Sequence, residues 1–245
     1  MVGLINEFFY KTFAFKIHIV KDIKYKPKGH LWFEREEFKK IYASIKDNTV
    51  VDEERCYLLF QLARYVTSLN GELAEVGVYK GGTARLIACA SILKNKTLHL
   101  FDTFSGLPKV NSEKDTHWQG GEFSDTSFDE VKKYLSDIKN VKIYKGFFPK
   151  TADPIQDKIF CFVHIDVDIY QSALDCYEFF YKRLIDGGIM IFDDYGFIGC
   201  EGLKGAVDEF SFANDIYPIY LPTGQGMIIK NGKWMLKKSK IRFFN

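Results

Sequence analysis

Two short apolar runs that each end in a pair of acidic residues constrain this chain most strongly. The first run ends in Asp166 and Asp168, and the second ends in Asp193 and Asp194. Apolar runs of this length with a helical segment between them are typical of buried parallel strands joined by a crossover. If the two strands are neighbours, all four carboxylates meet at their carboxyl ends, the edge where open α/β sheets bind ligands.

Four carboxylates crowded at one edge repel each other, and a divalent cation relieves this repulsion. Carboxylate oxygens suit hard ions such as Mg²⁺, Ca²⁺ or Mn²⁺. In the alternative interpretation Asp193 and Asp194 cap a helix or form a turn, and Asp168 is solvated. Because both pairs stand at predicted strand ends, we favour a metal-assisted active site.

Strand and helix patterns alternate along the rest of the chain and predict a doubly wound α/β fold. Strands are expected at residues 72–78, 97–102, 141–144, 158–166, 189–193, 216–220 and 226–230. The intervening helices include one that opens with a capping box at Ser127 and Glu130 and one that closes at Gly187-Gly188. The regular alternation and a hairpin turn at Asn231-Gly232 predict a seven-stranded, mostly parallel sheet with an antiparallel terminal strand.

The length of 245 residues suits one large α/β domain. We expect residues 1–50 to form an N-terminal helical extension, because Phe38, Ile41, Tyr42 and Ile45 recur at helical spacing. Residues 51–245 would form the main domain. Within it, the polar, glycine-rich segment 103–126 is long enough to be a lid loop.

Composition excludes several classes of partner. Thirty-four basic and 32 acidic residues leave a net charge of +2, too small to indicate nucleic acid. The apolar start of the chain is interrupted by Glu7, Lys11 and Lys16, so no membrane span or signal peptide is expected. Five cysteines without CxxC spacing predict reduced thiols and a cytoplasmic location.

The first predicted strand leads into a glycine-rich turn that reads Glu75-Val-Gly77-Val-Tyr-Lys-Gly81-Gly82-Thr83. Its glycine spacing is wider than in the GxGxxG dinucleotide motif, which favours a ligand with a carboxylate and an amine over a pyrophosphate. The second strand ends in Asp102, where an acid accepts the ribose hydroxyls of an adenosine group or, alternatively, caps a turn. Together these features predict an adenosine-containing cofactor.

The acid cluster decides between the two main cofactors of this kind. An NAD(P)-dependent oxidoreductase needs a hydride path and no metal. A methyltransferase that uses S-adenosylmethionine needs a deprotonated nucleophile, and a bound metal acidifies a coordinated hydroxyl. Methyl transfer therefore fits the residues better.

Several ordered blocks between Gly71 and Phe210 resemble the macrocin O-methyltransferase family, metal-dependent enzymes that methylate sugar hydroxyls. The matching blocks are residues 74–83, 101–108 (Phe-Asp-Thr-Phe-Ser-Gly-Leu-Pro), 145–151, 164–170 (His-Ile-Asp-Val-Asp-Ile-Tyr), 193–196 (Asp-Asp-Tyr-Gly) and 206–210. The resemblance implies a Rossmann-like class I methyltransferase fold with S-adenosylmethionine and Mg²⁺ as cofactors. One departure is Ala173, where the family more often has threonine.

Carried over residue by residue, the resemblance implies that Asp166, Asp193 and Asp194 hold the metal. Asp168 would be the general base, because Ile169 stands where the related catechol-type enzymes place a lysine. Cofactor binding would fall to residues on the glycine turn and after the second strand, namely Glu75, Gly77, Tyr79, Thr83, Asp102 and Thr103.

The lid loop is expected to contact the acceptor through residues 118–122. His117 is either a second base or a surface residue, and His164 is expected to be a core histidine. The resemblance thus implies a homodimeric O-methyltransferase acting on a small-molecule substrate, through a hydroxyl of a nucleotide-sugar, a surface-glycan sugar or a glycoside. A catechol-type phenol O-methyltransferase is the nearest alternative, and an NAD(P)-dependent oxidoreductase a more distant one.

Overall fold

The computed structural model describes residues 35–91 and 96–230, and within them a seven-stranded sheet. The strand order is β3-β2-β1-β4-β5-β7-β6, with β1 to β5 parallel and β7 antiparallel to both β5 and β6. The strands are β1 (Glu72–Val76), β2 (Leu98–Asp102), β3 (Val141–Lys145), β4 (Phe160–Ile165), β5 (Leu184–Phe192), β6 (Ile219–Tyr220) and β7 (Gly226–Ile229). The predicted doubly wound sheet with an antiparallel end is confirmed.

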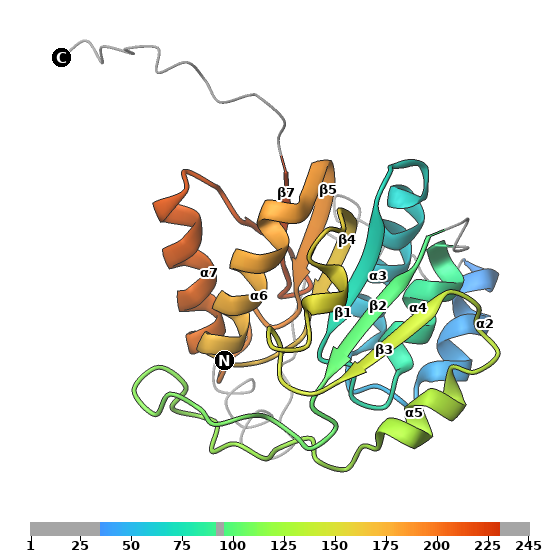
Figure 1. The fold of residues 1–245 in the computed structure, drawn as a ribbon, viewed down its shortest axis with the longest axis horizontal. Coiled ribbons are helices and arrows are strands. Elements are labelled where there is room, and N and C mark those ends of the chain that lie inside the picture. Colours follow the sequence, from blue (N-terminus) through green and yellow to red (C-terminus); the bar gives the residue numbers. More distant parts are fainter. Residues whose placement is uncertain (1–34, 92–95, 231–245) are drawn as a thin grey trace, which may run out of the picture. The chain divides into compact units, whose positions relative to one another are not determined.

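Helices cover both faces of this sheet (Figure 1). One face is covered by α6 (Tyr170–Arg183) and α7 (Glu201–Ala213). The other is covered by α2 (Glu36–Ile45), α3 (Glu53–Tyr65) and α4 (Gly82–Ser91), while α5 (Phe128–Tyr134) lies beside β3. Short 3₁₀ helices occupy Val66–Ser68 and Asp153–Ile155.

The core is densest where α6 packs on the central strands. All six residues of β4 are buried, as expected for a strand that is covered on both faces. Phe180 of α6 contacts Phe148 and Phe160, at centroid distances of 5.2 and 5.1 Å. Each fully buried phenylalanine stabilises the fold by roughly 1.5–3 kcal/mol. This packing holds α6 against β4, the strand after which Asp166 and Asp168 follow.

The helix predicted before residue 50 is confirmed as α2. Phe38 and Ile45 are fully buried, and the Phe38 ring meets Tyr57 of α3 edge-on at 4.9 Å. The start of α4 is tied to the same region, since the Gly82 amide donates to the Asn48 carbonyl at 3.0 Å. Residues 1–34 and the predicted Asn231-Gly232 hairpin lie outside the described residues.

Two local predictions are wrong. Gly187 and Gly188 do not end a helix: α6 ends at Arg183, and the glycines lie within β5. There the register shifts from Leu184 opposite Phe160 to Ile189 opposite Phe162, and the positive φ of Gly187 allows this bulge. Ser127 is the N-cap of α5, but its side chain makes no capping hydrogen bond.

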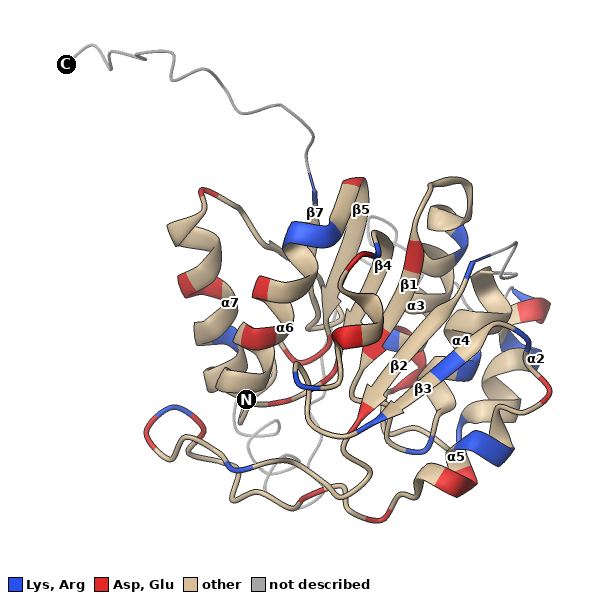
Figure 2. Ribbon diagram, viewed as in Figure 1, with Lys and Arg blue, Asp and Glu red and all other residues tan. Residues whose placement is uncertain are grey.

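Basic and acidic segments are interspersed over the outer helices, and acidic segments also stand where β4 and β5 end (Figure 2). Within residues 35–91 and 96–230, no helix is long and apolar enough to cross a membrane. All five cysteines are free thiols, and four of them are buried.

Candidate active site

A cavity of about 350 Å³ opens at the carboxyl ends of the parallel strands. Most of the residues predicted from the sequence line it: Gly77, Tyr79, Asp102, Thr103, Asp166, Asp168, Asp193 and Asp194. Glu75 and Thr83 do not line it, although both are buried. The glycine turn and the acid cluster therefore share one cavity.

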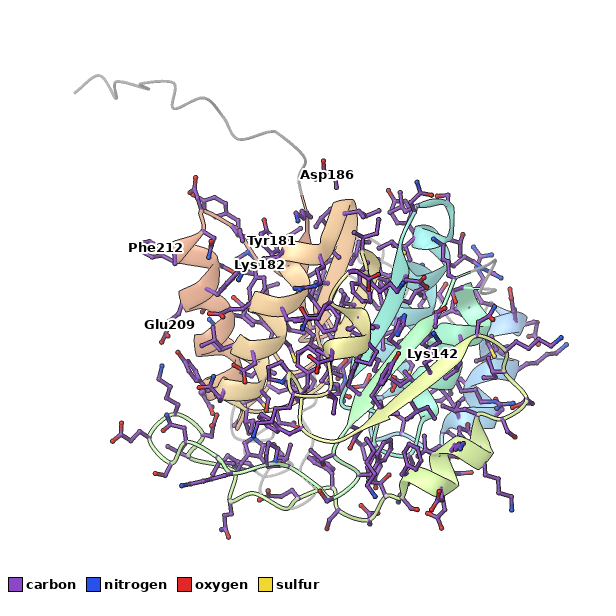
Figure 3. All side chains as sticks on the ribbon, in the orientation of Figure 1. Lys142, Tyr181, Lys182, Asp186, Glu209 and Phe212 are labelled. Atoms are coloured by element: carbon purple, nitrogen blue, oxygen red, sulfur yellow. The ribbon has the colours of Figure 1, made fainter. Side chains whose placement is uncertain are left out.

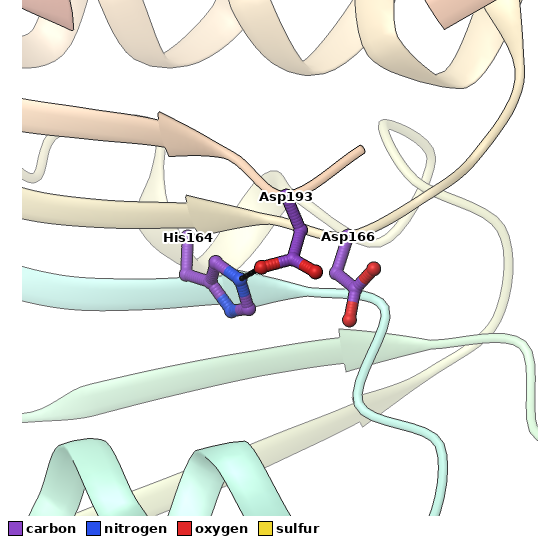
Figure 4. Close-up of side chains that lie close together, drawn as sticks. All are labelled: His164, Asp166 and Asp193. Carbon is purple, nitrogen blue, oxygen red and sulfur yellow. Dashed lines mark hydrogen bonds and ion pairs between the residues drawn. The ribbon is translucent and has the colours of Figure 1, made fainter. Parts of the chain in front are cut away.

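Strand pairing brings the acidic residues together. Ile165 of β4 stands opposite Phe192 of β5, so the residues that follow them, Asp166 and Asp193, emerge side by side (Figure 4). One ligand atom from each of these and one from His164 lie within 4.8 Å of one another. Asp168, Asp194 and Cys200 form a second group with the same spacing.

Gly77 allows the ends of β1 and β4 to meet. Its φ is +87°, and a Cβ at this position would overlap the backbone oxygen of Asp166 and lie 2.7 Å from its carbonyl carbon. The Asp166 amide in turn donates to the Val76 carbonyl at 2.9 Å. This glycine is therefore required by the neighbouring strand that carries an acid of the cluster.

Asp193 is fully buried and receives hydrogen bonds from three side chains. Oδ1 accepts from Gln225 Nε2 at 2.7 Å and faces His164 Nε2 at 3.2 Å (Figure 4). Oδ2 accepts from Arg55 Nη1. Burial raises the pKa of Asp193, but the bonds and charges of His164 and Arg55 outweigh it and hold the pKa below its usual value.

The other three acids have raised pKa values. Burial, followed by repulsion from the neighbouring carboxylates, raises the pKa of Asp166 and Asp168 well above the usual value. The same causes raise the pKa of Asp194 to about 6. Oδ2 of Asp194 is buried and has no hydrogen-bond partner among the described residues. An unpartnered buried carboxylate oxygen among like charges fits a hard cation.

Arg55, which sequence-based reasoning missed, connects α3 to this cluster. Asp52 caps α3 and accepts from both the Arg55 amide (3.0 Å) and its Nε (2.8 Å). The guanidinium then reaches Asp193 and, at 3.3 Å, Asp194. A single arginine at a helix start gives no sequence signal of contacts this distant along the chain.

Asp168 lies among the acids, as its predicted role requires. It follows β4 with a φ of +59°, and its carboxyl faces both Asp194 and the Cys200 thiol, whose Sγ lies 3.8 Å from Oδ1. Asp168 also lines the cavity.

His164 is a core histidine, as expected. Its ring is fully buried between Glu75 Oε1, 2.9 Å from Nδ1, and Asp193. Burial lowers the pKa of His164, but the two carboxylates raise it to about 9. Glu75 is thus linked to the acid cluster indirectly, because it contacts His164, which in turn contacts Asp193.

Asp102 holds the glycine turn. Its Oδ2 accepts from the amides of Val78 (2.7 Å) and Tyr79 (2.9 Å), and its Oδ1 accepts from the Phe104 amide (2.6 Å). A carboxylate has about four acceptor positions, so about one remains for a ligand hydroxyl. Thr103 also lines the cavity, but its hydroxyl donates to the Gly106 carbonyl at 2.7 Å.

The segment 103–126 lies along the mouth of the cavity, which His117, Trp118 and Phe123 help to line. Gln119, Gly120, Gly121 and Glu122 do not line it. Instead, the amides of Gln119 and Gly120 both donate to the Glu122 carboxylate at 2.9 Å.

Two contacts anchor this segment to the helices. Buried Asp115 accepts from the Tyr170 amide at the start of α6, at 2.8 Å. Lys114 donates to Glu209 at 3.1 Å, and Glu209 projects from the outer side of α7 (Figure 3). The segment therefore closes one side of the cavity and is tied to the helix that follows Asp168.

Comparisons with known proteins agree with this architecture. The demethyldecarbamoylnovobiocin O-methyltransferase of Streptomyces niveus is 28% identical over 162 residues, 61% of each chain. The mycinamicin III 3''-O-methyltransferase of Micromonospora griseorubida is 30% identical over 156 residues, 57% of this chain and 60% of that protein. The chain thus spans about three fifths of the length of these curated relatives.

Among solved structures, the O-methyltransferase NovP shares the fold, with a TM-score of 0.66 at 24% identity over 76% of this chain and 83% of that chain. A calicheamicin methyltransferase gives a TM-score of 0.59 at 17% identity over 87% and 98%. The family model of macrocin O-methyltransferase (TylF) matches residues 46–220. With most of its length matched, the chain belongs to the macrocin O-methyltransferase family.

Proposed function

We propose that this protein is an S-adenosylmethionine-dependent O-methyltransferase that methylates a sugar hydroxyl with the help of a divalent cation, Mg²⁺ above all. The observation that carries the proposal is one cavity lined by both the glycine turn and four acidic side chains. Family membership and the names of the relatives support methyl transfer to oxygen.

Asp166, Asp193 and Asp194 would hold the cation. Their oxygens are hard ligands, and the buried Oδ2 of Asp194, which no described residue hydrogen-bonds, would offer a free coordination position. A divalent cation bound there would supply Lewis acidity that makes an acceptor hydroxyl easier to deprotonate.

Asp168 would accept the proton of the acceptor hydroxyl at a carboxylate oxygen. Its carboxyl faces Asp194, one of the proposed ligands, and lines the cavity, so an ionised Asp168 would stand beside the cation site. Its place after β4 and before α6 is fixed by the Asp115 bond to the Tyr170 amide. The base is therefore held on rigid elements, which limits misalignment with the acceptor oxygen.

The cofactor would lie along the glycine turn. The turn at Gly77 presents backbone to the cavity, and the remaining acceptor position of Asp102 suits one ribose hydroxyl. Trp118 and Phe123 would cover the bound reactants and exclude water from the sulfonium group. Glu75 would act indirectly, since it supports His164 rather than touching the cavity.

The acceptor class is proposed from the relatives, which by name act on demethyldecarbamoylnovobiocin, mycinamicin III and a rhamnosyl tetracenomycin. A glycoside, a nucleotide-sugar and a surface-glycan sugar are the three forms in which a sugar hydroxyl would reach this cavity.

Methyl transfer from radiolabelled S-adenosylmethionine to a panel of glycosides, nucleotide-sugars and catechols tests the proposal. We expect the wild type to transfer methyl to a sugar in the presence of Mg²⁺. Transfer should be lost when EDTA is added to the wild type, and also in the Asp194→Asn variant. The wild type in EDTA and Asp194→Asn should both still bind S-adenosylmethionine. Full activity in EDTA would remove the metal from the mechanism. Transfer to catechols alone would replace the sugar with a phenol as the acceptor.

A further inference from the structure

Arg55 is the one lysine or arginine among the described residues that line the cavity. Its side chain is buried, with the residue only 8% exposed. Besides the acids, its guanidinium contacts the Phe197 ring, with Cζ 4.5 Å from the centroid. A buried guanidinium with this many partners is held in place.

Two carboxylate oxygens of the acid cluster differ in their contact with Arg55. Oδ2 of Asp193 accepts a charged hydrogen bond from Nη1, and no other donor in the described part of the chain bonds to it. Oδ2 of Asp194 has no hydrogen-bond partner in the part of the chain that the structure describes, and Arg55 contacts the other oxygen of that carboxyl at 3.3 Å. The guanidinium thus occupies a direction in which Asp193 would otherwise offer its oxygen to a cation.

We propose that Arg55 is a built-in counter-ion of the acid cluster, which holds the cluster together without a metal and competes with a divalent cation for Oδ2 of Asp193. The inference rests on the metal site of the proposed function. Arg55 is a positioning residue in this account, because it acts through Asp193 and Asp194 and not on the methyl group.

The competition has an electrostatic and a geometric part. A fixed positive charge a few ångströms from a divalent ion repels it, and burial weakens the screening by water. Arg55 also keeps two contacts that do not depend on the cluster, its Nε bond to Asp52 and its stacking on Phe197. The guanidinium can therefore lose its hydrogen bond to Asp193 when an ion binds there and still remain in the wall of the cavity.

Isothermal titration of the full chain with Mg²⁺ tests the inference in Arg55→Gln and in the control Arg64→Gln. Arg64 lies on the same helix but bonds to Glu37 at the surface. We expect Arg55→Gln to bind Mg²⁺ at least about tenfold more tightly than the wild type. Without Mg²⁺, Arg55→Gln should also unfold at a lower temperature than the wild type. Addition of Mg²⁺ should raise its unfolding temperature by more than it raises that of the wild type. Arg64→Gln should match the wild type in Mg²⁺ affinity and in the gain from Mg²⁺.

Two further variants separate charge from geometry. Arg55→Lys keeps the positive charge and should bind Mg²⁺ within about threefold of the wild type. Gln225→Met removes a neutral donor to Asp193 and should not tighten binding, because no repulsion is relieved. Equal or weaker binding by Arg55→Gln, or tighter binding by Gln225→Met, would overturn the inference while leaving the metal site intact.

A measurement on the wild-type protein covers the case in which Arg55→Gln does not fold. In ¹⁵N-labelled protein, Mg²⁺ should shift the Arg55 Nε–Hε signal, assigned by its absence in Arg55→Lys, and leave that of Arg64 in place. Mg²⁺ binding without this shift would refute the competition. No Mg²⁺ binding at all would overturn both this inference and the metal site, whereas S-adenosylmethionine binding in the same samples tests the rest of the proposed function separately.

Discussion

Replacing Gly77 by alanine should destabilise the protein far more than the same change at Gly187. Both glycines have a positive φ, +87° and +79°, a conformation that costs an alanine about 1–2 kcal/mol. No atom of residues 35–91 or 96–230 lies within 4 Å of a Cβ built at Gly187. At Gly77 the Cβ would overlap the Asp166 backbone, so the two strand ends would have to separate by about 2 Å to reach ordinary contact.

That separation would weaken two backbone hydrogen bonds of 2.9 Å, from Gly77 to Phe101 and from Asp166 to Val76. At about 1 kcal/mol for each bond, Gly77→Ala should lower the free energy of unfolding by roughly 3–4 kcal/mol, against about 1–2 for Gly187→Ala. Urea unfolding followed by circular dichroism measures both values. Equal losses in the two variants would refute the claim that contact with β4 requires this glycine.

Three further predictions concern other parts of the molecule. Asp168→Asn should lower kcat by roughly 10²–10⁴-fold and leave the Kd for S-adenosylmethionine unchanged; a parallel loss of cofactor binding would contradict its role as a base. Burial lowers the pKa of His99 to about 4, so the unfolded chain takes up a proton near pH 6.5 that the folded protein resists. Stability should therefore fall by up to about 3 kcal/mol from pH 6.5 to 4, and His99→Phe should flatten this slope in urea titrations; an unchanged slope would exclude His99 as its source. Asp115→Ala leaves the Tyr170 amide without its acceptor and should lower the free energy of unfolding by about 1–3 kcal/mol, with faster proteolysis in 103–126; protease resistance equal to the wild type would show that another contact anchors the segment.

The strand pattern and the acid pairs were enough to predict the architecture and where the acids meet. Short continuous apolar runs place the buried strands, and parallel pairing then dictates that residues after neighbouring strands share an edge. This is why Asp166 and Asp193 were predicted as neighbours although 27 residues separate their numbers. The fold of a βαβ unit follows from local patterns that can be read without tertiary information.

Contacts made by packing could not be predicted in this way. Arg55 reaches Asp193 across a sequence separation of 138 residues, and its neighbourhood reads as an ordinary capped helix start. Glu75 occupies a position in the glycine-turn motif that suggests a ligand contact. In the structure, however, its side chain contacts His164 on the neighbouring strand. The glycine pair within β5, Gly187 and Gly188, has the composition of a helix end, and only the pairing with β4 shows it to be a bulge.

The acids after β4 and β5 are proposed to form a cation site within the cavity. Titration of Mn²⁺, a paramagnetic substitute for Mg²⁺, into the wild type and Asp194→Asn tests it directly by electron paramagnetic resonance. We expect one bound ion in the wild type, at least tenfold weaker binding in Asp194→Asn, and equal S-adenosylmethionine binding by both proteins. Equal Mn²⁺ binding by the two proteins, or none by either, would contradict the account.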